Sequence, residues 1–200
     1  MIESALLSSG LRNIAGVDEA GRGACAGPLV VAAVVLRDVN SEAMRSVADS
    51  KSLSPRARES LVAPILENSI SHSIITISAD EIDRIGLHRA NLEGMRRAVS
   101  ALECELDYVL TDGYEIEGIT TPHLAVWKGD QVALSISAAS IIAKVHRDQL
   151  MVELDREFPG YGLAQHKGYV TRSHQEALER IGVSRIHRKS YANIAALVHN

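Results

Sequence analysis

The sequence has few aromatic residues, few cysteines and no long apolar run. Aromatic side chains make up 4% of its 200 residues, so aliphatic residues must build the core. The same scarcity argues against a protein that binds nucleic acid by extensive stacking of bases on aromatic platforms. Cys25 and Cys104 are far apart and lack the spacing of a metal site, which fits a reducing cytoplasm.

Targeting and membrane segments are also missing from the sequence. No signal peptide opens it, and no apolar run approaches the roughly 18 residues that suggest a membrane-spanning helix. We therefore expect neither export nor membrane insertion, and a cytoplasmic location. Apolar residues at 46% and charged residues at 23% are typical of a globular protein, and 200 residues suggest a single domain overall.

The net charge of −4 is unevenly distributed. Up to Ala143 the sequence has 12 Lys and Arg against 19 Asp and Glu, a balance of −7. From Lys144 onward it has 9 against 6, a balance of +3, with five of the eight histidines. A carboxylate-bearing body with a basic C-terminal segment suits a metal-dependent enzyme that acts on a polyanion, although ordinary charge scatter is an equal alternative.

Two adjacent carboxylates, Asp18 and Glu19, close an apolar run and precede Gly21-Arg22-Gly23. Neighbouring side chains of a strand point to opposite faces, so we expect the strand to end or bulge here if both serve one ligand. The glycines let backbone N–H groups approach a ligand closely, and the arginine adds positive charge. Taken alone, the stretch is better explained as a solvated turn of acidic residues and glycines.

The hydrophobic pattern predicts an α/β protein. A β-branched run and short apolar segments predict strands, and helical spacing with Ser-Pro or Gly boundaries predicts helices. The predicted strands are residues 11–18, 28–36, 69–78, 108–112 and 124–127, and the first two are expected to form a hairpin. The predicted helices are 54–67, 79–86, 90–102, 135–158 and 173–181, after a frayed lead-in at 1–10.

Two further carboxylates are expected at strand ends. Asp112 closes a short apolar strand before Gly113, and Asp130 follows Lys128-Gly129 after the last predicted strand. With Asp18 and Glu19 they form an oxygen-only donor set, which favours Mg²⁺ or Mn²⁺ over zinc. Carboxylates around two such ions are suited to phosphodiester hydrolysis.

Seven motifs in this order give the chain a resemblance to type 2 ribonuclease H, the bacterial ribonuclease HII family, over nearly its whole length. They are Gly16-Val17-Asp18-Glu19-Ala20-Gly21-Arg22-Gly23, Asp49-Ser50-Lys51, Thr111-Asp112-Gly113, Lys128-Gly129-Asp130, Ser137 to Val145 with Arg147-Asp148, His166-Lys167-Gly168-Tyr169 and His187-Arg188-Lys189-Ser190-Tyr191. The resemblance implies an RNase H-like mixed five-stranded sheet flanked by helices, with three antiparallel and two parallel strands. It also implies a catalytic body over residues 1–158 and a basic C-terminal helical segment over 159–200.

The resemblance assigns roles residue by residue. It implies catalytic, metal-binding carboxylates at Asp18, Glu19, Asp112 and Asp130, holding two divalent ions, Mn²⁺ or Mg²⁺. Substrate-binding residues are implied at Gly21, Arg22 and Gly23, which would contact the ribonucleotide, and at Tyr169, which would pack against the following deoxyribose. Lys51, Ser140, Lys144 and Arg188 are implied as phosphate contacts or structural supports. Ala24-Cys25 departs from the Pro-Leu that the family often has after this loop, which leaves the stiffness of the loop open.

The implied function is an endoribonuclease that cuts the RNA strand of RNA–DNA hybrids and incises 5′ of ribonucleotides embedded in duplex DNA. We expect a monomer with no membrane partner, and the sequence identifies no replication-clamp partner. Three alternatives remain: a resolvase-type DNA nuclease on the same fold, a nucleotide-binding switch, and a non-catalytic hybrid-binding module. Cleavage of a duplex that contains one ribonucleotide, with and without metal, would separate them.

Overall fold

A mixed five-stranded sheet forms the middle layer of the protein, in the strand order β3-β2-β1-β4-β5. In the computed structural model, which describes residues 2–48 and 54–198, β1 pairs antiparallel with β2 and parallel with β4, while β2–β3 is antiparallel and β4–β5 parallel. The strands are β1 (Ile14–Ala20), β2 (Leu29–Leu36), β3 (Ser69–Ile77), β4 (Tyr108–Asp112) and β5 (His123–Val126). The predicted mixed sheet is confirmed.

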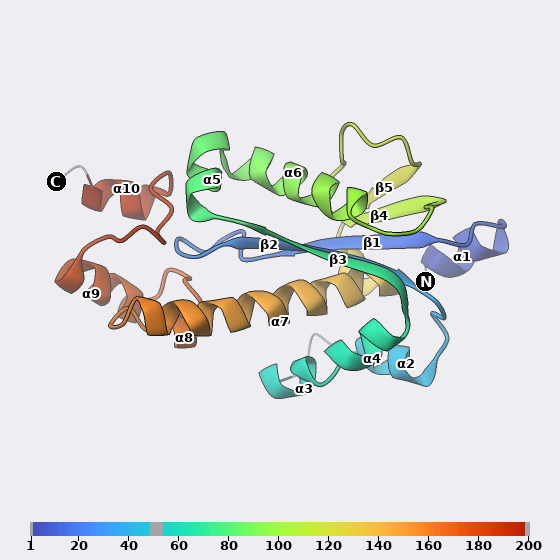
Figure 1. Cartoon of the computed structure of the whole chain (residues 1–200), viewed down its shortest axis with the longest axis horizontal. Coiled ribbons are helices and arrows are strands. Elements are labelled where there is room, and N and C mark those ends of the chain that lie inside the picture. Colours follow the sequence, from blue (N-terminus) through green and yellow to red (C-terminus); the bar gives the residue numbers. More distant parts are fainter. Residues whose placement is uncertain (1, 49–53, 199–200) are drawn as a thin grey trace.

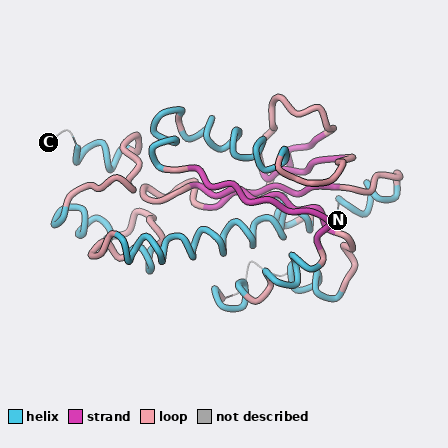
Figure 2. Tube along the Cα trace, in the orientation of Figure 1, coloured by secondary structure: helices cyan, strands magenta, loops and turns pink. Residues whose placement is uncertain are grey.

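Helices cover both faces of the sheet (Figure 1). One face carries α5 (Ala79–Ile85) and α6 (Leu87–Ser100), and the other carries α7 (Leu134–Glu157), with α2 (Glu42–Ala48), α3 (Pro55–Glu59) and α4 (Val62–Glu67) beyond its N-terminal half. The tube in Figure 2 shows α8 (Leu163–His166), α9 (Arg172–Ile181) and α10 (Ala192–Val198) gathered at one end, far from α1 (Ile2–Ser8). No helix in the described part of the chain is long and apolar enough to cross a membrane.

The central strands are buried on both faces, which explains the continuous apolar run of β2. Alternate residues of β1 and β2, such as Val17 and Val31, pack with the α6 residues Ala90 and Met95. The intervening residues, such as Val30, Ala32 and Val34, pack against the small residues at the start of α7. The two faces of the sheet therefore have separate cores.

Helix α7 lies unusually close to β1. A Cβ atom at Gly16 would stand 2.1 Å from the carbonyl carbon of Ser135, so only glycine fits. Ser137, Ala138 and Ala139 are buried at this contact. These small side chains allow the helix to pack closely on the sheet.

Two predicted elements differ from the structure. The single helix predicted over 54–67 is interrupted at Ser60 and Leu61. In a continuous helix the Pro64 ring would clash with the carbonyl of Ser60, four residues earlier, so the helix breaks there. The lead-in at 1–10 is the helix α1, and its Glu3 carboxylate is buried and accepts hydrogen bonds from the Ser135 backbone N–H and hydroxyl, both at 2.8 Å.

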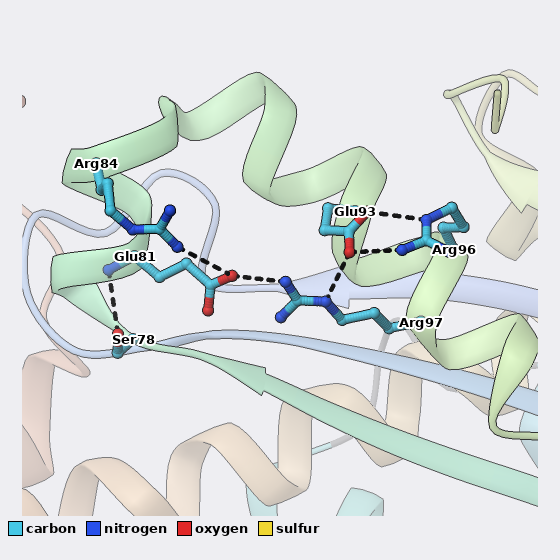
Figure 3. A network of polar contacts seen from close by, with 6 residues as sticks. All are labelled: Ser78, Glu81, Arg84, Glu93, Arg96 and Arg97. Carbon is cyan, nitrogen blue, oxygen red and sulfur yellow. Dashed lines mark hydrogen bonds and ion pairs between the residues drawn. The ribbon is translucent and has the colours of Figure 1, made fainter. Parts of the chain in front are cut away.

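Charged contacts join α5 to α6 on the outer surface (Figure 3). Glu93 accepts hydrogen bonds from Arg96 and Arg97, and Arg97 also pairs with Glu81 at 2.7 Å. These hydrogen bonds lower the pKa of Glu93 to about 2. The network orients α6 over the sheet from outside, while Gly94 sits against the sheet from inside.

The C-terminal helices share a core with the body. Leu163, Leu178 and Ile194 pack with Cys25, from the loop after β1, and with Met151 of α7. The predicted boundary at 158/159 falls just after the end of α7, and the division into a body and a C-terminal segment remains a proposal.

Candidate active site

The paired carboxylates lie within a regular strand. Asp18 and Glu19 pair in register with β2 and without a bulge, so the expectation that the strand ends or bulges at this pair is wrong. Instead, the pairing of β1 with β4 stops at Val17 and Thr111, one residue before Asp18. In this register Asp18 lies level with Asp112, the last residue of β4, and Glu19 lies where β1 extends past the end of β4.

Each carboxylate reaches this position from a different face of the sheet. Asp18 lies on the α7 side, where a contact with the Ser140 hydroxyl opposes the rise of its pKa that burial causes. Glu19 lies on the α6 side, where the Asn91 amide opposes the rise of its pKa that burial causes. Both nevertheless interact electrostatically with Asp112, so the three carboxylates are neighbours although Asp18 and Glu19 lie on different faces. As the side chains stand, the described residues contain no group of three or more acidic, histidine or cysteine side chains close enough together to hold a metal ion.

Burial and mutual repulsion disfavour the simultaneous ionisation of Asp18, Glu19 and Asp112. Burial, and then the charges of Glu19 and Asp112, raise the pKa of Asp18 well above its ordinary value. Burial, and then Asp112, raise the pKa of Glu19 to about 7 against the pull of Arg22. Oε2 of Glu19 is buried and has no hydrogen-bond partner among the described residues. An oxygen-only donor set with an unpartnered oxygen fits a hard divalent cation.

The fourth carboxylate, Asp130, is held by a turn rather than a strand end. Strand β5 ends at Val126, and Asp130 lies in the 3₁₀ turn η2 (Gly129–Gln131), after Lys128 in the left-handed region at φ 54°. The backbone N–H of Gly129 donates to Oδ1 of Asp112 at 2.7 Å, which fixes the turn to the end of β4.

A cavity of about 390 Å³ opens beside the carboxylates. It brings together residues that lie far apart in the sequence and that were predicted to act together. Its lining includes Glu19, Gly21, Arg22, Gly23, Asp130, Ser140, Lys144 and Tyr169. Two of the predicted metal-binding residues, Glu19 and Asp130, thus lie beside most of the predicted substrate-binding residues, whereas Asp18 and Asp112 are not part of the lining.

Arg147 connects the Gly21-Arg22-Gly23 loop to Tyr169. Gly21 has φ +88°, and a Cβ there would stand 1.8 Å from Nε of Arg147, so this guanidinium occupies the space beside the loop. Arg147 is fully buried, donates to the Lys167 carbonyl at 2.9 Å, and lies 5.6 Å from the centre of the Tyr169 ring. The half-exposed Tyr169 ring therefore rests on a buried cation and faces the loop.

Arg188 supports the same loop from inside. Its guanidinium is fully buried and donates to the carbonyls of Gly21 at 2.9 Å, Arg22 at 3.2 Å and Gly27 at 3.0 Å. Burial lowers its pKa. A contact between Arg188 and a substrate phosphate does not fit this position, and the alternative of a structural support does.

The remaining sequence predictions have mixed outcomes. Ser140 and Lys144 line the cavity, and Lys144 also pairs with Asp148 at 2.6 Å. Lys51 lies outside the described residues. The basic C-terminal segment does not present all its positive charge to a ligand, because Arg147 and Arg188 are buried and Arg185 pairs with Glu157.

Sequence reasoning missed a pair of histidines behind Tyr169. His174 and His187 are buried with their Nε2 atoms 3.2 Å apart, and Nδ1 of His174 lies 3.0 Å from the Tyr169 carbonyl oxygen. Burial and His174 lower the pKa of His187 to about 4, so the pair is uncharged at neutral pH. Their separation of 13 positions in a polar segment gave no periodic signal.

Comparisons with known proteins agree with this geometry. Residues 15–194 match the family model described as Ribonuclease HII. The chain is 50% identical over 200 residues to "Ribonuclease HII" of Cutibacterium acnes, covering 99% of this chain and 98% of the relative. It is also similar to the ribonuclease H2 crystal structure from Pyrococcus horikoshii OT3, with a TM-score of 0.81 and 26% sequence identity. The match covers 94% of this chain and 97% of the other. Bst-RNase HIII in complex with Mn²⁺ shares the fold, with a TM-score of 0.76 and 20% sequence identity. The match covers 94% of this chain and 69% of the other.

Proposed function

The chain belongs to the ribonuclease HII family, and on this premise we propose that it incises duplex DNA 5′ of embedded ribonucleotides as well as cutting the RNA of RNA–DNA hybrids. As a member of this family it is a nuclease, a hydrolase with ribonuclease H activity. The proposed cut leaves a 3′-hydroxyl and a 5′-phosphate. We propose that it acts as a monomer.

One observation carries the proposal. The cavity of about 390 Å³ is lined by the carboxylates Glu19 and Asp130 together with the glycine loop and Tyr169. A scissile phosphate beside Glu19 and Asp130 would therefore be flanked by groups suited to contact its sugars. Neither a nucleotide-binding switch nor a non-catalytic binding module accounts for the carboxylates placed here.

The carboxylates are proposed to hold two divalent ions, Mg²⁺ or Mn²⁺. Asp18, Glu19, Asp112 and Asp130 would supply the oxygen ligands, and the raised pKa values of Asp18 and Glu19 reflect the charge that such ions would neutralise. When bound, the ions lower the pKa of the attacking water and stabilise the entering and leaving oxygens. The chain's own part is to hold the ligands at fixed positions and to orient the phosphate between them.

The loop is proposed to recognise the ribose. Gly21 and Gly23 leave the backbone accessible, and backbone groups can hydrogen-bond the 2′-hydroxyl that distinguishes RNA from DNA. Arg147 and Arg188 hold this loop from inside, since both are buried and donate only to backbone carbonyls or to Tyr191 within the described residues. The reading surface is thereby rigid before the substrate arrives.

A defined duplex tests this proposal. A DNA duplex with a single ribonucleotide should be cut once, 5′ of that ribonucleotide, when Mg²⁺ or Mn²⁺ is present and not in EDTA. The products should carry a 3′-hydroxyl and a 5′-phosphate, as a ligation assay would show. Cleavage of an all-DNA duplex at a similar rate would instead favour the resolvase-type nuclease.

Tyr169 provides a test of junction recognition. Its ring is half exposed beside Gly23, where a flat apolar surface can pack against a sugar that lacks a 2′-hydroxyl. Tyr169→Ala should lower the cleavage rate at a single ribonucleotide by about 10-fold to 100-fold, the equivalent of 1–3 kcal/mol for one lost packing contact. Tyr169→Phe should lose much less, because the ring and not the hydroxyl makes the contact.

The matched measurement is the melting temperature of each variant and its rate on a uniform RNA–DNA hybrid. We expect Tyr169→Ala to spare the hybrid and to melt close to the parent. Equal losses on both substrates that follow a drop in melting temperature would assign Tyr169 a packing role instead.

A further inference from the structure

Asn91 is a buried amide that makes no hydrogen bond of regular geometry with the described residues. Its side chain is 0% exposed, and neither Nδ2 nor Oδ1 has a partner in the described part of the chain. Buried polar groups are nearly always paired, so such an amide needs an explanation. No motif had marked Asn91.

The position of Asn91 on α6 makes a buried polar side chain there more unexpected. The helix packs so closely on the sheet that a Cβ at Gly94 would stand 2.6 Å from the Ile77 side chain and 2.8 Å from that of Val31. Asn91, Gly94, Met95 and Ala98 form its buried face. At helical spacing an apolar residue is expected at this position, and asparagine stands there instead.

The unpartnered amide lies against the unpartnered oxygen of the candidate active site. Oε2 of Glu19 is also buried without a partner, and Glu19 lies on the α6 side of the sheet. Asn91 is close enough to lower the pKa of Glu19, yet no hydrogen bond of regular geometry joins the two side chains. A donor and an acceptor thus stand side by side, buried and unjoined.

We propose that Asn91 is a positioning residue that orients Glu19 by donating a hydrogen bond from Nδ2 to Oε2 when the other Glu19 oxygen holds a divalent ion. This inference rests on the proposed function. Carboxylates that bind metal are themselves held by hydrogen bonds, and loss of such a partner commonly weakens metal affinity 10-fold to 100-fold. A hydrogen bond from a neutral amide stabilises the ionised form of Glu19. A cationic donor would stabilise it too, but its positive charge would repel the metal ion.

Calorimetric titration with Mn²⁺, without substrate, tests the proposal. The variant Asn91→Leu has a similar volume and no donor, and we expect its Mn²⁺ affinity to fall by about 10-fold to 100-fold. Its metal-free form should melt at the same or a higher temperature, because an unpaired buried amide is removed. Asn91→Thr retains a hydroxyl donor, so it should recover part of the affinity and serves if the leucine variant fails to fold.

Ser73→Ala is the matched control. The Ser73 hydroxyl donates to the Ala98 carbonyl at 2.6 Å and is another buried polar contact between α6 and the sheet. This variant should melt at a lower temperature with unchanged Mn²⁺ affinity. Unchanged Mn²⁺ affinity in Asn91→Leu, or a loss that accompanies lower stability of the metal-free form, would overturn the proposal.

A second variant separates this inference from the proposed function. Asp112→Asn should also weaken Mn²⁺ binding if the carboxylates form the metal site. If Asp112→Asn binds Mn²⁺ normally, the proposed metal site is wrong; if only Asn91→Leu binds normally, the positioning role alone is wrong.

Discussion

Asp112→Asn is expected to lower the cleavage rate by about 1,000-fold or more, while its metal-free form becomes more stable than the parent. The rate falls because a ligand charge is lost where metal ions contribute several kcal/mol of transition-state stabilisation, and each 1.36 kcal/mol is a factor of ten. Stability rises because Asp112 raises the pKa of both Asp18 and Glu19, which shows that its charge repels theirs. Asparagine retains an oxygen that can accept from the Gly129 N–H.

The stability difference should depend on pH in a defined direction. The pKa of Glu19 is about 7 in the folded protein and 4.5 ordinarily, so the folded state binds more protons between these values. Stability of the metal-free protein therefore falls as pH rises from 4.5 to 7, by about 3 kcal/mol for a shift of this size. Removing the Asp112 charge reduces this loss, so the melting temperatures of variant and parent should diverge between pH 5 and pH 8 in EDTA.

Asp107→Asn is the control for this experiment. Asp107 lies just before β4, at the opposite end of that strand from Asp112, and accepts from the backbone N–H groups of Arg12 and Asn13. The control should cleave at the parent rate. Near-normal cleavage by Asp112→Asn at saturating Mg²⁺ would remove Asp112 from the site.

Arg188→Met should lower the free energy of unfolding by about 1–3 kcal/mol, the cost of leaving a buried acceptor without its hydrogen bond. Methionine can fill much of the volume, but the carbonyls of Gly21, Arg22 and Gly27 each lose one donor. The Gly21 carbonyl keeps the Ala24 N–H and the Arg22 carbonyl keeps the Tyr191 hydroxyl. The glycine loop then loses its inner support. We therefore expect weaker substrate binding at a temperature where the variant remains folded, with Mn²⁺ affinity largely retained.

Arg185→Met, three residues earlier, is the comparison for Arg188→Met. Arg185 is exposed and pairs with Glu157, and exposed pairs contribute about 0–1 kcal/mol. Urea denaturation should separate the two variants clearly. If Arg188→Met is as stable as Arg185→Met and instead shows a flatter dependence of substrate affinity on salt, Arg188 is a phosphate contact after all.

Local sequence signals predicted much of this fold. Packing in the structure agrees with what three local patterns indicate. They are the apolar β-branched run of β2, the short strand before Asp112 and the small residues of α7. The four carboxylates were predicted as metal ligands at strand ends, but only Asp112 ends a strand: Asp18 and Glu19 lie within β1, and Asp130 lies in a turn. Pro64 could have predicted the break between α3 and α4, because its effect on the preceding turn is local.

Features that depend on distant contacts could not be predicted in this way. The burial of Arg188 depends on carbonyls more than 160 positions earlier, with 167 positions separating it from Gly21. Asn91 looked like one residue of an amphipathic helix, and only its packing against β1 makes it unusual. Asp18 and Glu19 lie near Asp112 because the pairing of β1 with β4 stops at Val17 and Thr111. No pattern within either strand reveals this register.

The dependence of the glycine loop on Arg188 has a consequence for synthesis of the chain. As the protein leaves the ribosome, the last of its four carboxylates, Asp130, emerges well before Tyr169 and Arg188. A nascent chain would therefore contain all four carboxylates while the glycine loop still lacks the hydrogen bonds from Arg188. The loop can reach its supported conformation only after the C-terminal residues have been made and have docked, so the cavity is completed last during synthesis.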